Sequence, residues 1–175
     1  MGEAVEDLLA QLTAAGRGEL GHGPDHPTAP EVDLVAHTDD LLARVPHLRS
    51  DPEYTYFLRR YSGGSFYVAR TNCVVNVHGF CLSRPWFEWP QVGEVDATGA
   101  PEFTFADSLL VPPGSGQPKL TTVVFGLSGR GAARPVVRAC AGVSGRVGPE
   151  REVCDGFLAW LELMVVTGGT FCPAW

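Results

Sequence analysis

The sequence predicts an α+β domain in which N-terminal helices and a C-terminal helix pack on an antiparallel β-sheet of about five or six strands. Apolar side chains recur at helical spacing near both ends of the chain, and short β-like runs follow residue 64. The turn segments between these runs are too short for crossover helices, which favours antiparallel pairing. With 175 residues, of which 45% are hydrophobic and 19% charged, the chain suits one domain over residues 1–175.

The first third of the chain contains two helical patterns with a break between them. Residues 3–15 place four apolar side chains on one helix face, and Gly16 stops the pattern. Residues 17–30 contain three glycines and three prolines, so we expect a surface loop or linker there. Residues 31–44 are ambiguous between strand and helix, and the later part of this segment favours a helix.

The segment DPEYTYFLRRYSGG, residues 51–64, carries signals for both ends of a helix. Asp51 is suited to cap the free amides of the first turn, and Pro52 suits the first helical position. An apolar stripe follows at i, i+3, i+4 and i+7, which predicts an amphipathic helix. We expect Gly63 or Gly64 to supply the left-handed residue that ends it.

Six β-like runs follow, and a helical pattern closes the chain. The runs are SFYVAR, CVVNVHGF, WFEW, FTFADSLLV, LTTVVFGL and PVVRACAG. Residues 151–169 then place Cys154, Phe157, Leu158 and Leu161 on one helix face, with Gly168 and Gly169 after it. We expect this last helix to pack on the sheet.

The charge and the N-terminus restrict the partners and the compartment. A formal net charge of −7 repels a phosphate backbone, so direct nucleic-acid binding is disfavoured and a basic protein partner is favoured. The N-terminal residues are acidic where a secretory signal is basic, and no run of about 18 apolar residues occurs, which predicts a cytoplasmic protein that does not span a membrane. Five cysteines without a signal sequence are expected to be reduced thiols.

Two arrangements of residues suggest chemistry without matching a known pattern. Cys73, His78 and Cys81 follow C-x4-H-x2-C, which is not a familiar zinc spacing. A hydrolase would need His78, Cys81 and Asp107 side by side, and no catalytic signature surrounds them. We therefore predict no catalytic residue, no metal site and no cofactor.

The segment RPWFEWPQVGEVDATGAPEFTFAD, residues 84–107, combines aromatic and acidic side chains with no basic residue after Arg84. Aromatic anchors beside uncompensated acids are suited to grip a basic protein. The alternative is that the aromatic side chains turn into the core and the acids are solvated loop residues. The candidate partner-binding residues are Trp86, Glu88, Trp89, Glu94, Asp96, Glu102 and Asp107.

The order of these elements resembles the SUKH superfamily of Smi/Knr-like proteins, which includes bacterial toxin-immunity proteins. The resemblance covers most of residues 46–169 and depends on the helix that ends in YSGG, the β-runs with FTFADS, and VCDGFLAWLELMVVTGG. It implies helices packed on a twisted antiparallel sheet and a function in binding rather than catalysis. A member of this kind would be an immunity protein that neutralises a basic, nuclease-type toxin. The alternatives are an intracellular regulatory scaffold and a small Cys/His hydrolase or zinc protein.

Overall fold

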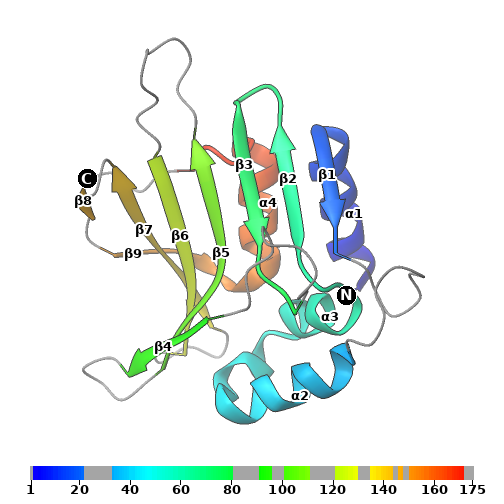
Figure 1. Ribbon diagram of the computed structural model, residues 1–175, viewed down its shortest axis with the longest axis vertical. Coiled ribbons are helices and arrows are strands. Elements are labelled where there is room, and N and C mark those ends of the chain that lie inside the picture. Colours follow the sequence, from blue (N-terminus) through cyan, green and yellow to red (C-terminus); the bar gives the residue numbers. More distant parts are fainter. Residues whose placement is uncertain are drawn as a thin grey trace.

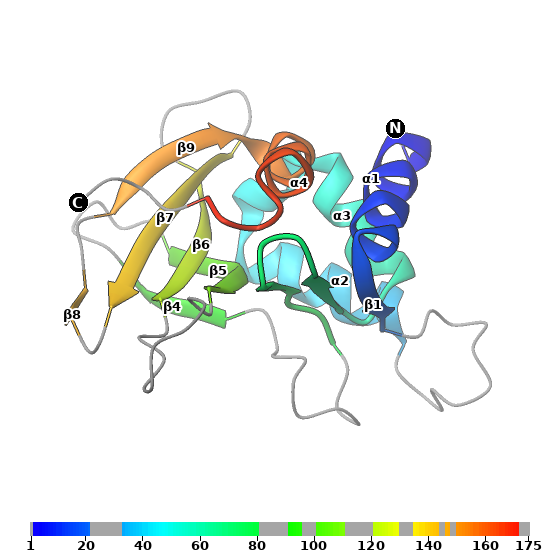
Figure 2. The same cartoon turned by 90° about the horizontal axis from the view of Figure 1, so that it is seen from above.

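An antiparallel β-sheet with helices on one face forms the framework of the protein (Figures 1 and 2). The computed structural model describes residues 2–21, 33–80, 91–95, 101–110, 121–129, 135–143, 146–147 and 150–171. The helices are α1 (Gly2–Ala14), α2 (Leu34–Arg44), α3 (Pro52–Arg60) and α4 (Gly156–Thr167), with a 3₁₀ turn at Pro46–Ser50. The predicted α+β class is confirmed, including the C-terminal helix on the sheet. None of the described helices has the length and apolar character that crossing a membrane requires.

The described part of the sheet has nine strands, which is more than the five or six expected. The strands are β1 (Gly16–Leu20), β2 (Gly64–Val68), β3 (Cys73–Val77), β4 (Gln91–Val95), β5 (Pro101–Leu110), β6 (Thr121–Ser128), β7 (Val136–Val143), β8 (Arg146–Val147) and β9 (Arg151–Asp155). They are ordered β1-β2-β3-β5-β6-β7-β8, while β4 pairs with β5 and β9 pairs with β7. The expected strand at WFEW, residues 86–89, lies outside the described residues.

Strand β1 corrects the prediction that residues 17–30 form a loop. Residues 16–20 pair with β2 over their whole length, and the Gly21 amide donates to the Gly63 carbonyl at 2.5 Å. The segment GRGEL lacks the apolar alternation by which a strand is recognised. Hydrogen bonds to β2 stabilise this strand more than side-chain burial does. Gly16 permits the close approach, since a Cβ there would lie 2.1 Å from the Tyr67 carbonyl oxygen. Residues 22–30 lie outside the described part of the chain.

The start of α3 agrees with the prediction, whereas its end does not. The Asp51 Oδ1 atom accepts a hydrogen bond from the Tyr54 amide at 2.9 Å, as a capping residue should. The helix ends at Arg60, and Tyr61 follows with an extended backbone rather than a left-handed one. Gly63, at φ 127°, therefore does not cap the helix. It lies where strands converge, since a Cβ on Gly79 would be 2.3 Å from the Gly63 amide nitrogen.

Helix α4 begins five residues later than the helical pattern suggests. Residues 151–155 form β9, so Cys154 lies on a strand and not on the predicted helix face. Gly156 has φ +77°, which turns the chain from β9 into the helix. The far end agrees with the prediction, because Gly168 adopts a left-handed backbone at φ 62° and caps the helix.

An aromatic cluster fills the space between the helices and the sheet. The Trp160 ring of α4 packs edge-on against Phe105 and Phe125, with ring centroids 5.0 and 5.5 Å apart. Tyr54 of α3 meets Phe157 of α4 at 5.1 Å. All five side chains are fully buried, so this cluster holds α3 and α4 against β5 and β6.

Candidate functional site

The face of the sheet opposite the helices carries a row of polar side chains across three strands. Ser65 of β2 lies opposite Asn76 of β3, and Asn76 lies opposite Asp107 of β5. Their strand neighbours Phe66 and Val75 are buried on the helix side, so alternation directs the polar residues away from the core. We call Ser65, Asn76, Asp107 and the nearby His78 the polar row.

Hydrogen bonds connect the members of the polar row. The Ser65 hydroxyl donates to Asn76 Oδ1 at 2.8 Å, and Asn76 Nδ2 donates to Asp107 Oδ1 at 2.8 Å. The other carboxylate oxygen, Oδ2, lies 2.9 Å from His78 Nε2. Asp107 is therefore held by two neighbours and is only 17% exposed. It is not the loosely solvated loop acid that the alternative interpretation of this segment expected.

The structure also brings His78 and Asp107 together, which are two of the three residues that a hydrolase would need side by side. His78 is 3% exposed, and its backbone amide donates to the Phe105 carbonyl at 2.7 Å. Its Nδ1 atom is buried and has no hydrogen-bond partner among the described residues. A carboxylate that orients an imidazole is one half of a nucleophile-activating arrangement. The third member, Cys81, lies outside the described residues.

The other predicted partner-binding residues are only partly within the described chain. Trp86, Glu88, Trp89 and Asp96 lie outside the described residues. The backbones at Glu94 and Glu102 belong to β4 and β5, which pair antiparallel with Val95 opposite Pro101. The structure therefore brings positions 94 and 102 to adjoining strands, with Asp107 farther along β5. Figure 1 shows β4 against the lower part of β5.

Burial raises the pKa of each of the three described cysteines, Cys73, Cys140 and Cys154. Cys73 is buried and donates to the Gly169 carbonyl at 3.1 Å. Burial, and then the negative charge of Asp107, raises the pKa of the Cys73 thiol to about 11. Burial likewise raises the pKa of Cys154 to about 12, so neither is a ready nucleophile. Among the described residues no three His, Cys, Asp or Glu side chains are grouped to bind a metal ion. Cys81 and Cys172 lie outside them.

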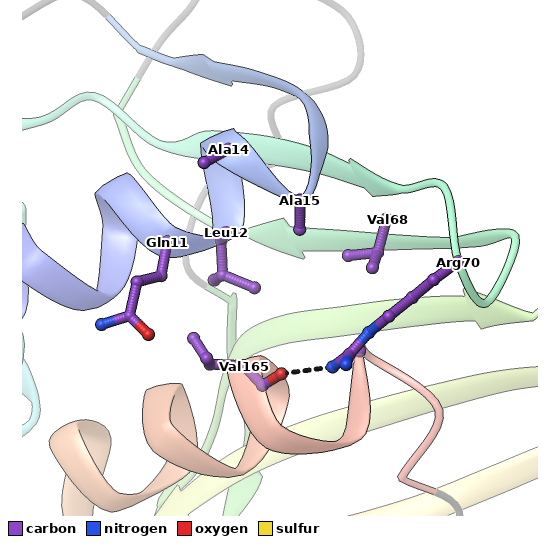
Figure 3. Close-up of a pocket in the computed structure, with 8 residues that line it drawn as sticks. Gln11, Leu12, Ala14, Ala15, Val68, Arg70 and Val165 are labelled. Carbon is purple, nitrogen blue, oxygen red and sulfur yellow. Dashed lines mark hydrogen bonds between the residues drawn. The ribbon is translucent and has the colours of Figure 1, made fainter.

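A shallow hollow of about 380 Å³ lies between α1, the end of β2 and the end of α4 (Figure 3). Arg70 reaches across it, and its Nη2 atom donates to the Val165 carbonyl at 2.7 Å and to the Val166 carbonyl at 3.1 Å. This guanidinium therefore neutralises the negative end of α4. The hollow is lined by Gln11, Leu12, Ala14, Ala15, Val68, Arg70, Val165 and Gly168. These residues include no acid–base pair, so the hollow offers packing surface rather than chemistry.

Sequence reasoning did not identify Ser65 and Asn76 as parts of a site. A signal was present, since Asn76 and His78 alternate with valines in CVVNVHGF and so share one strand face. Their meeting with Asp107 depends on the β3–β5 register, which has no local signature.

A comparison of the chain with protein-family models, curated proteins and solved structures found no match.

Proposed function

We propose that this protein is a non-enzymatic, cytoplasmic binding protein of the SUKH kind, an immunity protein that neutralises a basic, nuclease-type toxin. The observation that supports it most is the acidic stretch from residue 88 to residue 107, part of which forms the β4–β5 hairpin. The formal net charge of −7 adds to this support. A surface of this charge attracts a basic partner and speeds its association.

The acidic and basic residues are unevenly distributed along the sequence. The segment from Pro85 to Leu110 contains five acidic residues and no lysine or arginine. Five of the 13 basic residues instead lie between Arg130 and Arg151. Because charge of one sign is concentrated in one segment, a basic partner is steered toward the hairpin rather than toward the protein as a whole.

The proposal is tested by measuring how the purified protein associates with the toxin encoded beside its gene. The Glu94→Lys/Glu102→Lys variant should lower the association rate by about tenfold at low salt, because rim charges act on the encounter step. Added salt should slow the wild-type association in the same direction. Toxin activity measured in the same mixtures shows whether binding also neutralises it.

The matched control is Glu3→Lys/Asp7→Lys, which makes the same change in net charge at two exposed positions of α1. This control should bind nearly as the wild type does. Equal losses in the two variants would mean that net charge alone matters and that the hairpin is not the binding surface. No association of the wild type at low salt would count against the immunity function itself.

A second candidate, a small Cys/His hydrolase or zinc protein, is favoured by the 2.9 Å contact between His78 and Asp107. Elemental analysis of the purified chain separates the two functions. About one zinc per chain would favour this second candidate, since structural zinc binds tightly enough to survive purification. A metal-free chain that fails to cleave ester substrates would leave the binding function as the better proposal.

A further inference from the structure

Strand β1 forms one end of the sheet, and among the described elements only β2 pairs with it (Figure 1). Its sequence, GRGEL, contains no proline, so every residue carries both a backbone donor and an acceptor. An edge strand of this kind is a template for pairing with another chain. The composition of β1 therefore leaves its outer edge able to form a further ladder.

The backbone groups that point to this outer edge follow from the bonds to β2. The Ala69 amide donates to the Ala15 carbonyl, and the Gly21 amide donates to the Gly63 carbonyl. In antiparallel pairing, successive residues direct their backbone groups to opposite sides of the strand. Since the odd-numbered residues 15 and 21 bond to β2, the even-numbered Gly16, Gly18 and Leu20 direct their N–H and C=O groups outward.

The side chains of β1 are self-complementary about its central residue. Arg17 and Glu19 are both exposed, lie on the same face of the strand, and flank Gly18. If two copies of β1 pair antiparallel with Gly18 opposite Gly18, each Arg17 lies opposite Glu19 of the other copy. Opposite charges at directly paired positions stabilise a sheet, and a two-fold axis forms the pair twice.

The same charges reject the neighbouring registers. Shifting the two-fold axis by one residue in either direction places Arg17 opposite Arg17, or Glu19 opposite Glu19. Like charges directly opposite one another destabilise the pair. Only the pairing centred on Gly18 combines outward backbone groups, opposite charges and overlap of all five residues.

We propose that the protein forms a homodimer through β1, in which the two strands pair antiparallel about Gly18 and the two sheets become one. Helix α1 packs beside β1 on the helix side of the sheet, and its exposed residues include the small Ala10 and Ala14 (Figure 2). A five-residue ladder buries little surface, so the dimer is weak and depends on concentration. This proposal is independent of toxin binding.

Sedimentation velocity over a range from about 10 μM to about 1 mM tests the dimer. The wild type should shift reversibly from monomer to dimer. Arg17→Glu and Glu19→Arg each place like charges opposite one another and should raise the dissociation constant by at least about tenfold. The double variant Arg17→Glu/Glu19→Arg restores opposite charges with reversed polarity and should recover wild-type dimerisation.

Matched controls separate the edge from general charge effects. Arg49→Glu and Glu3→Arg make the same charge changes at exposed positions away from β1 and should leave the dimer unchanged. Circular dichroism checks that each variant is folded. A wild type that stays monomeric throughout the range would overturn the proposal. So would single reversals that dimerise normally, or a double variant that fails to recover.

Discussion

At the scale of single residues, Asp51 holds together two helices that are distant in the sequence. Its Oδ1 atom accepts from the Tyr54 amide at the start of α3, and its Oδ2 atom accepts from the Phe157 amide at the start of α4, at 2.7 Å. The carboxylate is 1% exposed and lies at the positive ends of two helix dipoles. Asp155, which precedes α4, makes no capping bond with its side chain, so Asp51 takes that role.

Replacing Asp51 should therefore cost more than the loss of one cap. We expect Asp51→Ala to lower the free energy of unfolding by about 3 kcal/mol, because two charge-assisted hydrogen bonds are lost. Asp51→Asn, whose amide group accepts at only one atom, should fall between this variant and the wild type. Urea denaturation measures both.

The control is Asp39→Ala, which removes an exposed carboxylate that pairs with Arg59 at 2.5 Å. Because exposed ion pairs add little to stability, its effect should be much smaller. Equal effects at positions 39 and 51 would contradict the double cap.

The bond from Asp51 to Tyr54 was predictable, since a cap acts within three residues. The bond to Phe157 spans 106 residues and was not.

At the scale of elements, Glu6 links α1 to α3. Its carboxylate accepts hydrogen bonds from the Tyr56 and Tyr61 hydroxyls and pairs with Arg60, whose Nε atom lies 2.8 Å from Oε1. Partial burial tends to raise the pKa of Glu6, but the two tyrosine hydrogen bonds and the charge of Arg60 outweigh it, so the pKa is lowered. Burial, together with its bond to Glu6, raises the pKa of Tyr61 to about 12.

The lowered pKa makes the contribution of Glu6 to stability depend on pH. Since its folded pKa lies below the ordinary value of 4.5, the stabilisation is complete above that pH and is lost as the pH falls through the folded pKa. We expect Glu6→Gln to be less stable than the wild type at pH 7. The difference should shrink progressively once the pH falls below 4.5. Denaturation midpoints measured from neutral to acidic pH give this comparison.

Glu3→Gln, at an exposed position of the same helix, serves as the control for the loss of a negative charge. A stability difference for Glu6→Gln that stays constant with pH would show that the carboxylate acts through packing rather than through its charge.

The elements themselves were predictable where a periodic pattern coincided with end signals. Helix α3 combines a cap, a proline and an apolar stripe, so its start was predicted correctly. Helix α4 was extended too far, because residues 151–155 also suit the helical period, and pairing with β7 makes them a strand instead. Strand β1 was missed because glycine and charged residues carry no strand propensity, and the backbone groups of β2 decide its conformation.

At the scale of the whole molecule, the aromatic cluster fixes the helices on the sheet, and Trp160 is its largest side chain. Its ring contacts Phe105, Phe125 and Phe157, with centroids 5.0, 5.5 and 5.8 Å away. The indole Nε1 atom is buried and has no hydrogen-bond partner within the part of the chain that the structure describes. The Trp160 ring therefore stabilises the fold through the apolar surface that it buries, while its Nε1–H donor does not contribute.

Two substitutions at Trp160 should consequently differ strongly. Trp160→Ala should cost about 3 to 5 kcal/mol, because it leaves a large cavity between α4 and the sheet. Trp160→Phe keeps most of the aromatic contact and removes an unsatisfied donor, so we expect a cost below about 1.5 kcal/mol. Equilibrium denaturation distinguishes them, and similar costs for both would mean that the indole nitrogen is bonded in solution.

The candidate site shows the same division between local and distant information. The acidic and aromatic character of residues 84–107 is visible in the sequence, and so is the shared strand face of Asn76 and His78. That Asp107 completes the polar row depends on the register of β3 against β5. A shift by one residue would turn Asp107 to the core face, and no nearby residue signals that register.

Local patterns in the chain were sufficient for the α+β class, the cap of α3, the stripe that α3 buries and the left-handed end of α4. The last three depend on residues within one or two helical turns, where backbone sterics and hydrogen bonding decide the outcome. Only the folded chain decided that Gly63 serves a close approach rather than a cap. It likewise decided that Asp51 serves two helices and that GRGEL becomes an edge strand. These features arise where distant segments meet, and the energy of such contacts has no periodicity along the sequence.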